Sequence, residues 1–217
     1  MFAIFDAKDS IETGLHTRNL ESPPGADLSI SCMSDQPATN TARQYDEAIA
    51  SCKNIFLKKA TDYGTAWRVL RTISIVDQVF IKAQRIRTIQ EKGDQRIGDD
   101  IPSEFRGIIN YCVIGSIQLE LPAGAPEELP VSRVAQLYDQ HVQTAKDLML
   151  DKNHDYGEAW RSMSQESFVD LILMKLQRIR QILINDGKTL ISEGIDANYL
   201  DILNYAVFAL ILIAENK

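Results

Sequence analysis

The chain has only three cysteines among its 217 residues, and Cys32, Cys52 and Cys112 form no CxxC pair and no cluster with histidine. An odd number of irregularly spaced cysteines is not the pattern of a disulfide framework or of a structural zinc site. We therefore expect free thiols in a reducing compartment, which predicts a cytoplasmic location.

Long hydrophobic runs are also absent. The longest, residues 202–214, is interrupted by Asn204 and is shorter than the roughly 20 residues that span a bilayer. The apolar start, residues 1–5, meets Asp6 at once and has no basic flank, so it does not resemble a signal peptide. The sequence predicts neither a membrane span nor secretion.

A surplus of positive charge is absent as well. The formal net charge is -7, and the most basic segment, residues 41–121, carries only +2. Proteins that follow a phosphate backbone need clustered lysine and arginine, so polymeric nucleic acid is not an expected partner, whereas a single nucleotide needs only a few cations. Glycine-rich phosphate loops and the motifs of serine hydrolases and zinc proteases are missing too, which leaves those enzyme classes without support.

What the chain does contain is a duplication. Residues 45–89 align without a gap to residues 138–182, and 20 of these 45 pairs are identical. Each copy carries KxxDYGxAWR, then SxVDxxxxKxQRIR and, one gap later, IxNY. Such self-similarity defines the domain organisation. We predict a flexible tail at 1–40, a first unit at 41–121, a proline-rich linker at 122–130 and a second unit at 131–217.

No segment shows strand-like alternation, and the apolar residues follow helical spacing. This predicts an all-α fold of tandem duplicated antiparallel helical bundle units that pack together, because each unit is too small to be strongly stable alone. In the second unit we expect helices over 138–152, from Ser167 to 184, and over 198–214. Ser-x-x-Asp, at Ser74 and at Ser167, predicts a capping box at the start of one helix in each unit.

Three acidic residues of the second unit are candidate ligands for magnesium, which prefers carboxylate oxygens. They are Asp155, Asp170 and Asp201. Asp201 shares a helix face with Asn204, but the aligned residue of the first unit is Gly107. If Asp201 is a ligand, only one complete site exists, centred on the second unit. Turn formation and helix capping explain the first two equally well.

The repeated cations and aromatic residues are candidates for binding a nucleotide. Guanidinium groups bind phosphate in a bidentate manner, and a lysine and arginine spaced i,i+3 share one helix face. The tryptophans are either platforms for a base or core anchors. The residues predicted to bind substrate are Tyr156, Trp160, Arg161, Lys175, Arg178 and Asn204 in the second unit, and Asp62, Trp67, Arg68, Lys82 and Arg85 in the first.

With these motifs, the sequence resembles the nucleotide-modification-associated domain 1 family, whose members often carry two copies, over residues 41–215. The resemblance implies an all-helical domain linked to the modification or metabolism of nucleotides. A more distant similarity is to all-helical nucleotide pyrophosphohydrolases of the MazG type, which hold magnesium with clustered acidic residues. The chain lacks their paired ExxE motif.

Our leading hypothesis is a nucleotide-binding protein and, in its stronger form, a magnesium-dependent pyrophosphohydrolase of nucleoside triphosphates. One alternative is a noncatalytic module that binds a nucleotide or an acidic segment of a partner. Another is a structural protein whose repeated polar residues cap helices and join the two units. The sequence leaves open whether the protein is an enzyme and whether a site lies within one chain or across a homodimer.

Overall fold

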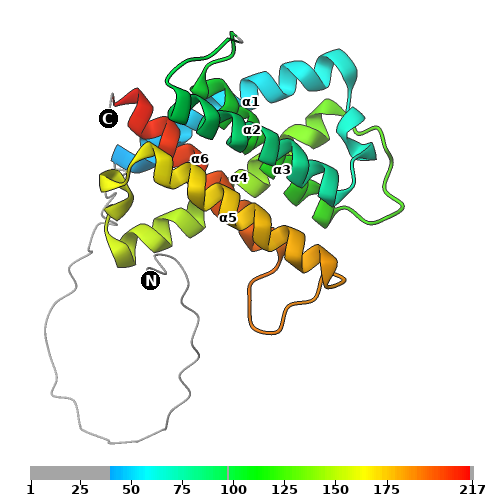
Figure 1. The fold of residues 1–217 in the computed structure, drawn as a ribbon. Helices are drawn as coiled ribbons and strands as arrows, with labels where there is room; N and C mark the ends of the chain where they lie inside the picture. Colours follow the sequence, from blue (N-terminus) through cyan, green and yellow to red (C-terminus); the bar gives the residue numbers. More distant parts are fainter. Residues whose placement is uncertain (1–39, 97, 216–217) are drawn as a thin grey trace, which may run out of the picture. The chain divides into compact units, whose positions relative to one another are not determined.

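The computed structural model describes residues 40–96 and 98–215, and this part of the chain contains helices and no strand. The all-α prediction is confirmed. The predicted tail lies outside the described residues except for Asn40. The elements are α1 (Asn40–Tyr63), the 3-10 helix η1 (Ala66–Val69), α2 (Thr72–Lys92), α3 (Ile101–Glu120), α4 (Val131–Tyr156), the 3-10 helix η2 (Ala159–Ser162), α5 (Gln165–Ile184) and α6 (Ile195–Ala214) (Figure 1).

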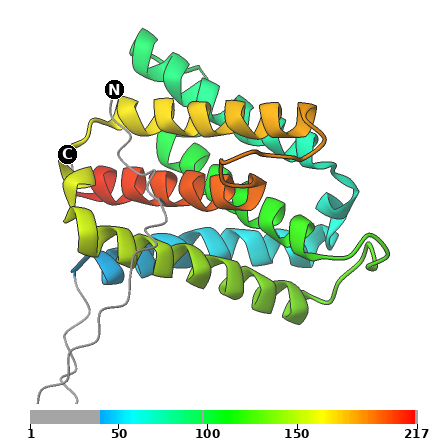
Figure 2. The ribbon, with the colours of Figure 1, turned by 90° about the horizontal axis from the view of Figure 1, so that it is seen from below.

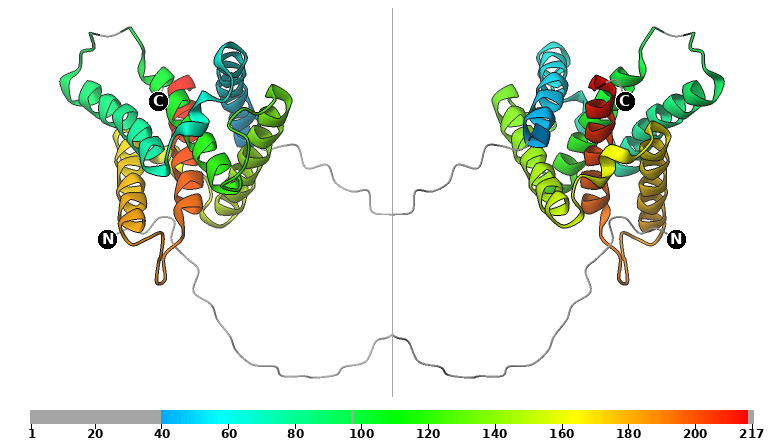
Figure 3. Two further views of the ribbon diagram at one scale, coloured as in Figure 1. Left: turned by 90° about the vertical axis from the view of Figure 1, so that its right-hand side faces the viewer. Right: turned by 90° about the vertical axis from the view of Figure 1, so that its left-hand side faces the viewer.

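The helices form two repeats with the same order of elements. Repeat one consists of α1, η1, α2 and α3, and repeat two of α4, η2, α5 and α6. The central pair is α3 and α6, with α2 and α5 on one side and α1 and α4 on the other (Figure 3). Each helix packs against its own counterpart in the other repeat, as expected for a pseudo-twofold arrangement.

The core is concentrated on α6, where fourteen of the twenty residues are buried. Figure 2 shows α6 running between α5 on one side and α1 and α4 on the other. By length and composition alone, α6 could cross a membrane, but 78% of its most apolar window is buried inside the protein. A helix buried in the core of a globular protein is apolar on most sides for the same reason, so the apolar sequence of α6 is explained by its burial.

Two tyrosine–asparagine pairs, one buried and one partly buried, join the repeats. The Tyr45 hydroxyl donates to Asn204 Oδ1 at 2.9 Å, and the Tyr138 hydroxyl donates to Asn110 Oδ1 at 2.9 Å. Each asparagine amide donates in turn to a main-chain carbonyl in the first helix of its own repeat. The repeated asparagine of the IxNY motif therefore fixes the central helices to both neighbouring first helices.

Two reciprocal ion pairs join α2 to α5 at the surface. Arg87 pairs with Asp170 and Arg180 pairs with Asp77, each at 2.9 Å. The aspartate of each SxVDxxxxKxQRIR motif thus binds the last arginine of the same motif in the other repeat. These aspartates therefore do not act as helix caps.

The predicted capping boxes are wrong because both helices begin earlier than the motif. Thr72 begins α2 and Gln165 begins α5, so Ser74 and Ser167 lie inside the first turn. The cap of α5 is Ser164, whose hydroxyl oxygen accepts from the main-chain N–H of Ser167 at 3.3 Å.

Two of the three cysteines lie in the core. Cys52 and Cys112 are buried free thiols, as predicted, and Cys32 lies outside the described residues. Burial raises the pKa of Cys52 to about 11, which favours the neutral thiol at physiological pH.

Candidate functional site

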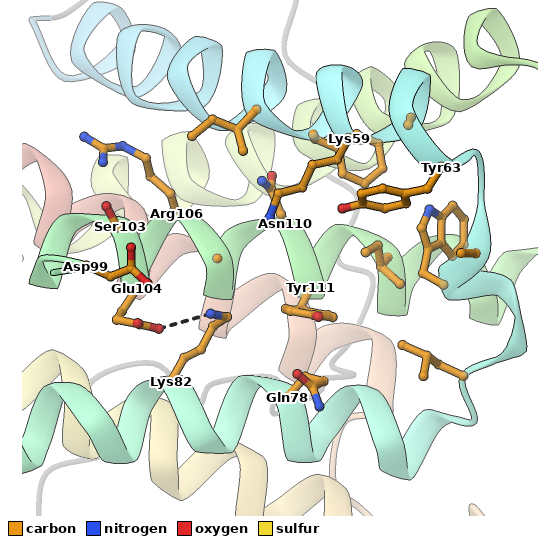
Figure 4. Close-up of a pocket in the computed structure, with 18 of the residues that line it drawn as sticks. Lys59, Tyr63, Gln78, Lys82, Asp99, Ser103, Glu104, Arg106, Asn110 and Tyr111 are labelled. Atoms are coloured by element: carbon orange, nitrogen blue, oxygen red, sulfur yellow. Dashed lines mark hydrogen bonds and ion pairs between the residues drawn. The ribbon is translucent and has the colours of Figure 1, made fainter. Parts of the chain in front are cut away.

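A cavity of about 530 Å³ lies in repeat one between α1 and α2, with α3 as its floor (Figure 4). We call it the repeat-one cavity. Its lining combines charged and aromatic side chains, and these occupy different ends of the cavity. Arg106, Ser103 and Glu104 lie at one end, and Tyr63 and Tyr111 lie at the other (Figure 4).

The charged end is built from α2 and α3. Lys82 Nζ lies 3.1 Å from Glu104 Oε2, and Arg85 pairs with the other oxygen of the same carboxylate. The lining cations Lys59 and Arg106 make no ion pair with any described residue. Lys59 therefore lines the cavity without a carboxylate partner among residues 40–96 and 98–215, whereas Arg106 interacts electrostatically with the Asp100 carboxylate.

The aromatic end is built from α1, η1 and α3. Tyr63 and Tyr111 are neighbours at this end. The pKa of Tyr63 is raised by burial and, to a smaller extent, by the nearby Tyr111. Trp67 also lines the cavity, and its buried indole Nε1 has no hydrogen-bond partner among the described residues. An indole N–H donates only, so it suits a ligand with an acceptor oxygen or nitrogen.

Gly107 makes room for a lysine on the floor of the cavity. A Cβ atom at this position would lie 2.7 Å from Lys82 Cε and 3.0 Å from its Nζ. Only a residue without a side chain lets Lys82 lie across α3 in this way.

The corresponding place in repeat two is closed by Asp201, which aligns with Gly107. Lys152 and Lys175 are the counterparts of Lys59 and Lys82, and each amine lies 2.7 Å from an oxygen of Asp201. The side chains of Asp201 and Lys175 are only 4% and 2% exposed. The two lysines therefore neutralise a carboxylate from their own repeat.

Apolar residues of repeat two replace other lining residues of the repeat-one cavity. Leu200 stands where repeat one has Arg106, and Leu171 stands where it has Gln78. Phe208 replaces Ile114, and its ring stacks on Trp160 at 4.2 Å between centroids. Trp160 is 1% exposed and acts as a core anchor.

The three predicted magnesium ligands are not brought together. Asp155 is exposed beside His154, Asp170 pairs with Arg87, and Asp201 is held by two lysines. Among residues 40–96 and 98–215, no group of three histidine, cysteine, aspartate or glutamate side chains is arranged to hold a metal ion. The residues present therefore do not fit a three-carboxylate magnesium site, and we derive no chemical step through magnesium.

The two arginines of the KxxDYGxAWR motif have structural contacts. Arg68 donates to main-chain carbonyls of the predicted linker and to Gln118. Arg161 pairs with Glu158 and Glu215 and lies over the ring of Trp160. These contacts hold the linker and the C-terminal end of α6 in place.

The other predicted substrate residues are divided between the cavity, the core and the surface. Lys82 and Trp67 line the cavity, and Arg85 holds Glu104 at its edge. Two of the remaining residues, Lys175 and Asn204, are buried in repeat two. The other three, Asp62, Tyr156 and Arg178, are exposed.

Sequence reasoning missed Lys59, Tyr63, Arg106 and Tyr111 as lining residues of one cavity. A signal was present, because Lys59 and Tyr63 belong to the first repeated motif and Tyr111 to the last. The exchange of Gly107 for Asp201 was noticed, but we interpreted the glycine as a missing ligand, whereas it makes room for the side chain of Lys82.

Comparison with known proteins gives one match. The profile of the family described as nucleotide modification associated domain 1 matches residues 59–119 and 152–213. These two regions begin at the paired lysines Lys59 and Lys152 and together cover more than half of the chain. No curated protein and no solved structure matches the chain at a significant level.

Proposed function

Since the chain belongs to the nucleotide modification associated domain 1 family, we propose that the repeat-one cavity binds a nucleotide. The observation that carries this proposal is the division of one cavity into a cationic end and an aromatic end. A nucleotide has the same division, with an anionic phosphate at one end and an aromatic base at the other.

The cationic end offers three contacts for phosphate. Arg106 supplies a guanidinium group, which can bind two phosphate oxygens at once, and Lys59 and Lys82 supply ammonium groups. Because Lys59 and Arg106 make no ion pair with a described residue, a bound phosphate does not have to displace an internal carboxylate from them.

The aromatic end suits a base. Stacking of a base on an aromatic side chain contributes about 1–3 kcal/mol per base. Tyr63, Trp67 and Tyr111 all line this end and offer aromatic rings for stacking. The volume of about 530 Å³ lies within the roughly 300–1,000 Å³ of small-molecule sites.

Our proposal is binding and does not extend to hydrolysis. A metal-dependent pyrophosphohydrolase needs carboxylates that converge on the metal. In repeat two Asp201 faces two lysines, and in the cavity Glu104 faces Lys82 and Arg85. The structural alternative explains the repeated asparagines and the SxVD carboxylates, but it gives no reason for a cationic and aromatic cavity. A cytoplasmic location and a homodimer stay predictions of the sequence.

Thermal unfolding with a panel of nucleotides tests the proposal. A ligand at about 100 times its dissociation constant adds about 2.7 kcal/mol to the free energy of unfolding. We expect Arg106→Leu, which installs the residue found in repeat two, to weaken nucleotide binding by at least about tenfold, or about 1.4 kcal/mol.

The matched control is Arg133→Leu, which removes an exposed arginine of α4 and should leave the affinity unchanged. If no nucleotide raises the unfolding temperature of the wild-type protein, the cavity does not bind nucleotides and the proposal is wrong.

A further inference from the structure

Repeat two contains its own anion between the two paired lysines. Lys152 from α4 and Lys175 from α5 approach the carboxylate of Asp201 from opposite sides, each at 2.7 Å. The buried carboxylate and ammonium groups are stable there because each neutralises the other. This arrangement shows which geometry the paired lysines of the fold adopt around a negative charge.

Repeat one keeps both lysines and lacks the carboxylate. Lys59 and Lys82 occupy the aligned positions on α1 and α2, but α3 carries Gly107 where α6 carries Asp201. Both lysines and Gly107 line the repeat-one cavity. In repeat one the end of the Lys82 side chain, and no carboxylate, therefore lies over residue 107 at the border of the cavity.

We infer that the phosphate of the ligand occupies in repeat one the position that the Asp201 carboxylate occupies in repeat two, held by Lys59 and Lys82 above Gly107. This inference rests on the proposed function and assigns the phosphate position within that site. Arg106, which has no cationic counterpart in repeat two, adds positive charge at the Ser103 end of the cavity (Figure 4).

Glu104 positions Lys82 for this role. Its carboxylate lies one helical turn before Gly107 and binds both Lys82 and Arg85. In repeat two the residue aligned with Glu104 is Asn198. The acidic residue of repeat one therefore stands one helical turn before the position that is acidic in repeat two. Repeat one thus keeps Lys82 paired with a carboxylate that does not come from position 107.

The charge of the cavity favours a single phosphate. Three lining cations, Lys59, Lys82 and Arg106, face two lining carboxylates, Glu104 and Asp99. The lining therefore has a net charge of +1, which a monophosphate dianion comes closer to balancing than a triphosphate does. A triphosphate brings more negative charge than these cations can balance and places it near both carboxylates.

The spacing along α3 agrees with a nucleoside monophosphate. Tyr111 follows Gly107 by four residues, which is about 6 Å along a helix axis. A phosphate above Gly107 and a base beside Tyr111 and Tyr63 leave this interval for the ribose. The ligand class is therefore a nucleoside 5′-monophosphate.

The test is to install the internal anion of repeat two in repeat one. Gly107→Asp should place a carboxylate between Lys59 and Lys82, with the flexible end of Lys82 moving aside as Lys175 does. We expect this variant to lose at least about tenfold in affinity for nucleoside 5′-monophosphates in calorimetric titration, with an unfolding temperature equal to or above that of the wild type. Gly124→Asp adds the same charge at an exposed position with open space around it and should bind as the wild type does.

A second pair of variants distinguishes a loss of binding from a folding defect in Gly107→Asp. Lys59→Gln should weaken binding of the monophosphate, and Lys58→Gln, which changes a neighbouring exposed lysine outside the cavity lining, should not. Wild-type affinity in Gly107→Asp and Lys59→Gln would overturn the phosphate position while leaving nucleotide binding intact. Tighter binding of triphosphates than of monophosphates by the wild type would overturn the ligand class, and no binding of either would overturn the proposed function as well.

Discussion

Asp201 is the residue at which the two repeats differ most in their chemistry. It is buried on the core helix α6, yet both of its oxygens face lysine amines at 2.7 Å. A buried ion pair contributes little compared with a well-packed apolar pair, but removing one partner leaves an unpaired buried charge. The loss of Asp201 should therefore affect folding through Lys175, whose side chain is 2% exposed.

We expect Asp201→Asn to lower the free energy of unfolding by about 3–5 kcal/mol, because the amide cannot neutralise Lys175. Urea denaturation followed by circular dichroism measures this change. Asp155→Asn, at a side chain that is 73% exposed, should change it by less than about 0.5 kcal/mol. Equal midpoints for Asp201→Asn and the wild type would show that the ion pair does not stabilise the fold.

For single residues, comparing the two repeats identified position 201 as an important difference, but the role predicted for Asp201, metal binding, differs from its contacts with two lysines. The exchange of Gly107 for Asp201 is visible in the aligned repeats. Whether an acidic residue binds a metal or a lysine depends on which helices cross above it, and that is a property of packing. Lys152 and Lys175 reach Asp201 from two different helices, α4 and α5.

The central helices α3 and α6 depend on polar contacts as well as on apolar burial. Each carries one asparagine that accepts a hydrogen bond from a tyrosine of the other repeat. Because the Tyr45–Asn204 pair is buried, a lost donor there leaves an acceptor without water to replace it. The two pairs therefore fix how the repeats dock.

We expect Tyr45→Phe to lower the free energy of unfolding by about 1–3 kcal/mol, because Asn204 Oδ1 loses its donor. Chemical denaturation measures the loss. Tyr199→Phe is the matched control, since its buried hydroxyl has no hydrogen-bond partner among the described residues and Phe105 stands at the aligned position of repeat one. A control variant that loses as much stability as Tyr45→Phe would contradict this account of the interface.

The elements themselves could largely be predicted from the sequence. Helical spacing of apolar residues predicted the helices, and a glycine with positive φ ends α2, at Gly93, and α4, at Gly157. The capping boxes failed because Ser-x-x-Asp also occurs inside a first turn. The partner of Asp170, Arg87, belongs to the other repeat, and local sequence rules do not describe contacts between repeats.

Across the whole described unit, the two repeats share one scaffold and differ in what fills it. Repeat one has a cavity lined by Arg106, Gln78 and Ile114, and repeat two has Leu200, Leu171 and Phe208 at the aligned positions. The duplication and the shared core are readable from the sequence. Which repeat stays open is not, because it depends on whether the stacked rings of Trp160 and Phe208 fill the available volume.

The most direct test of this account is the number of nucleotides bound per chain. Isothermal titration calorimetry of the full-length protein with a nucleoside 5′-monophosphate should give one site per chain, although the fold contains two repeats. Two equivalent sites would contradict the closure of repeat two by Asp201 and its lysines. The absence of any binding would contradict the assignment of the repeat-one cavity as a nucleotide site.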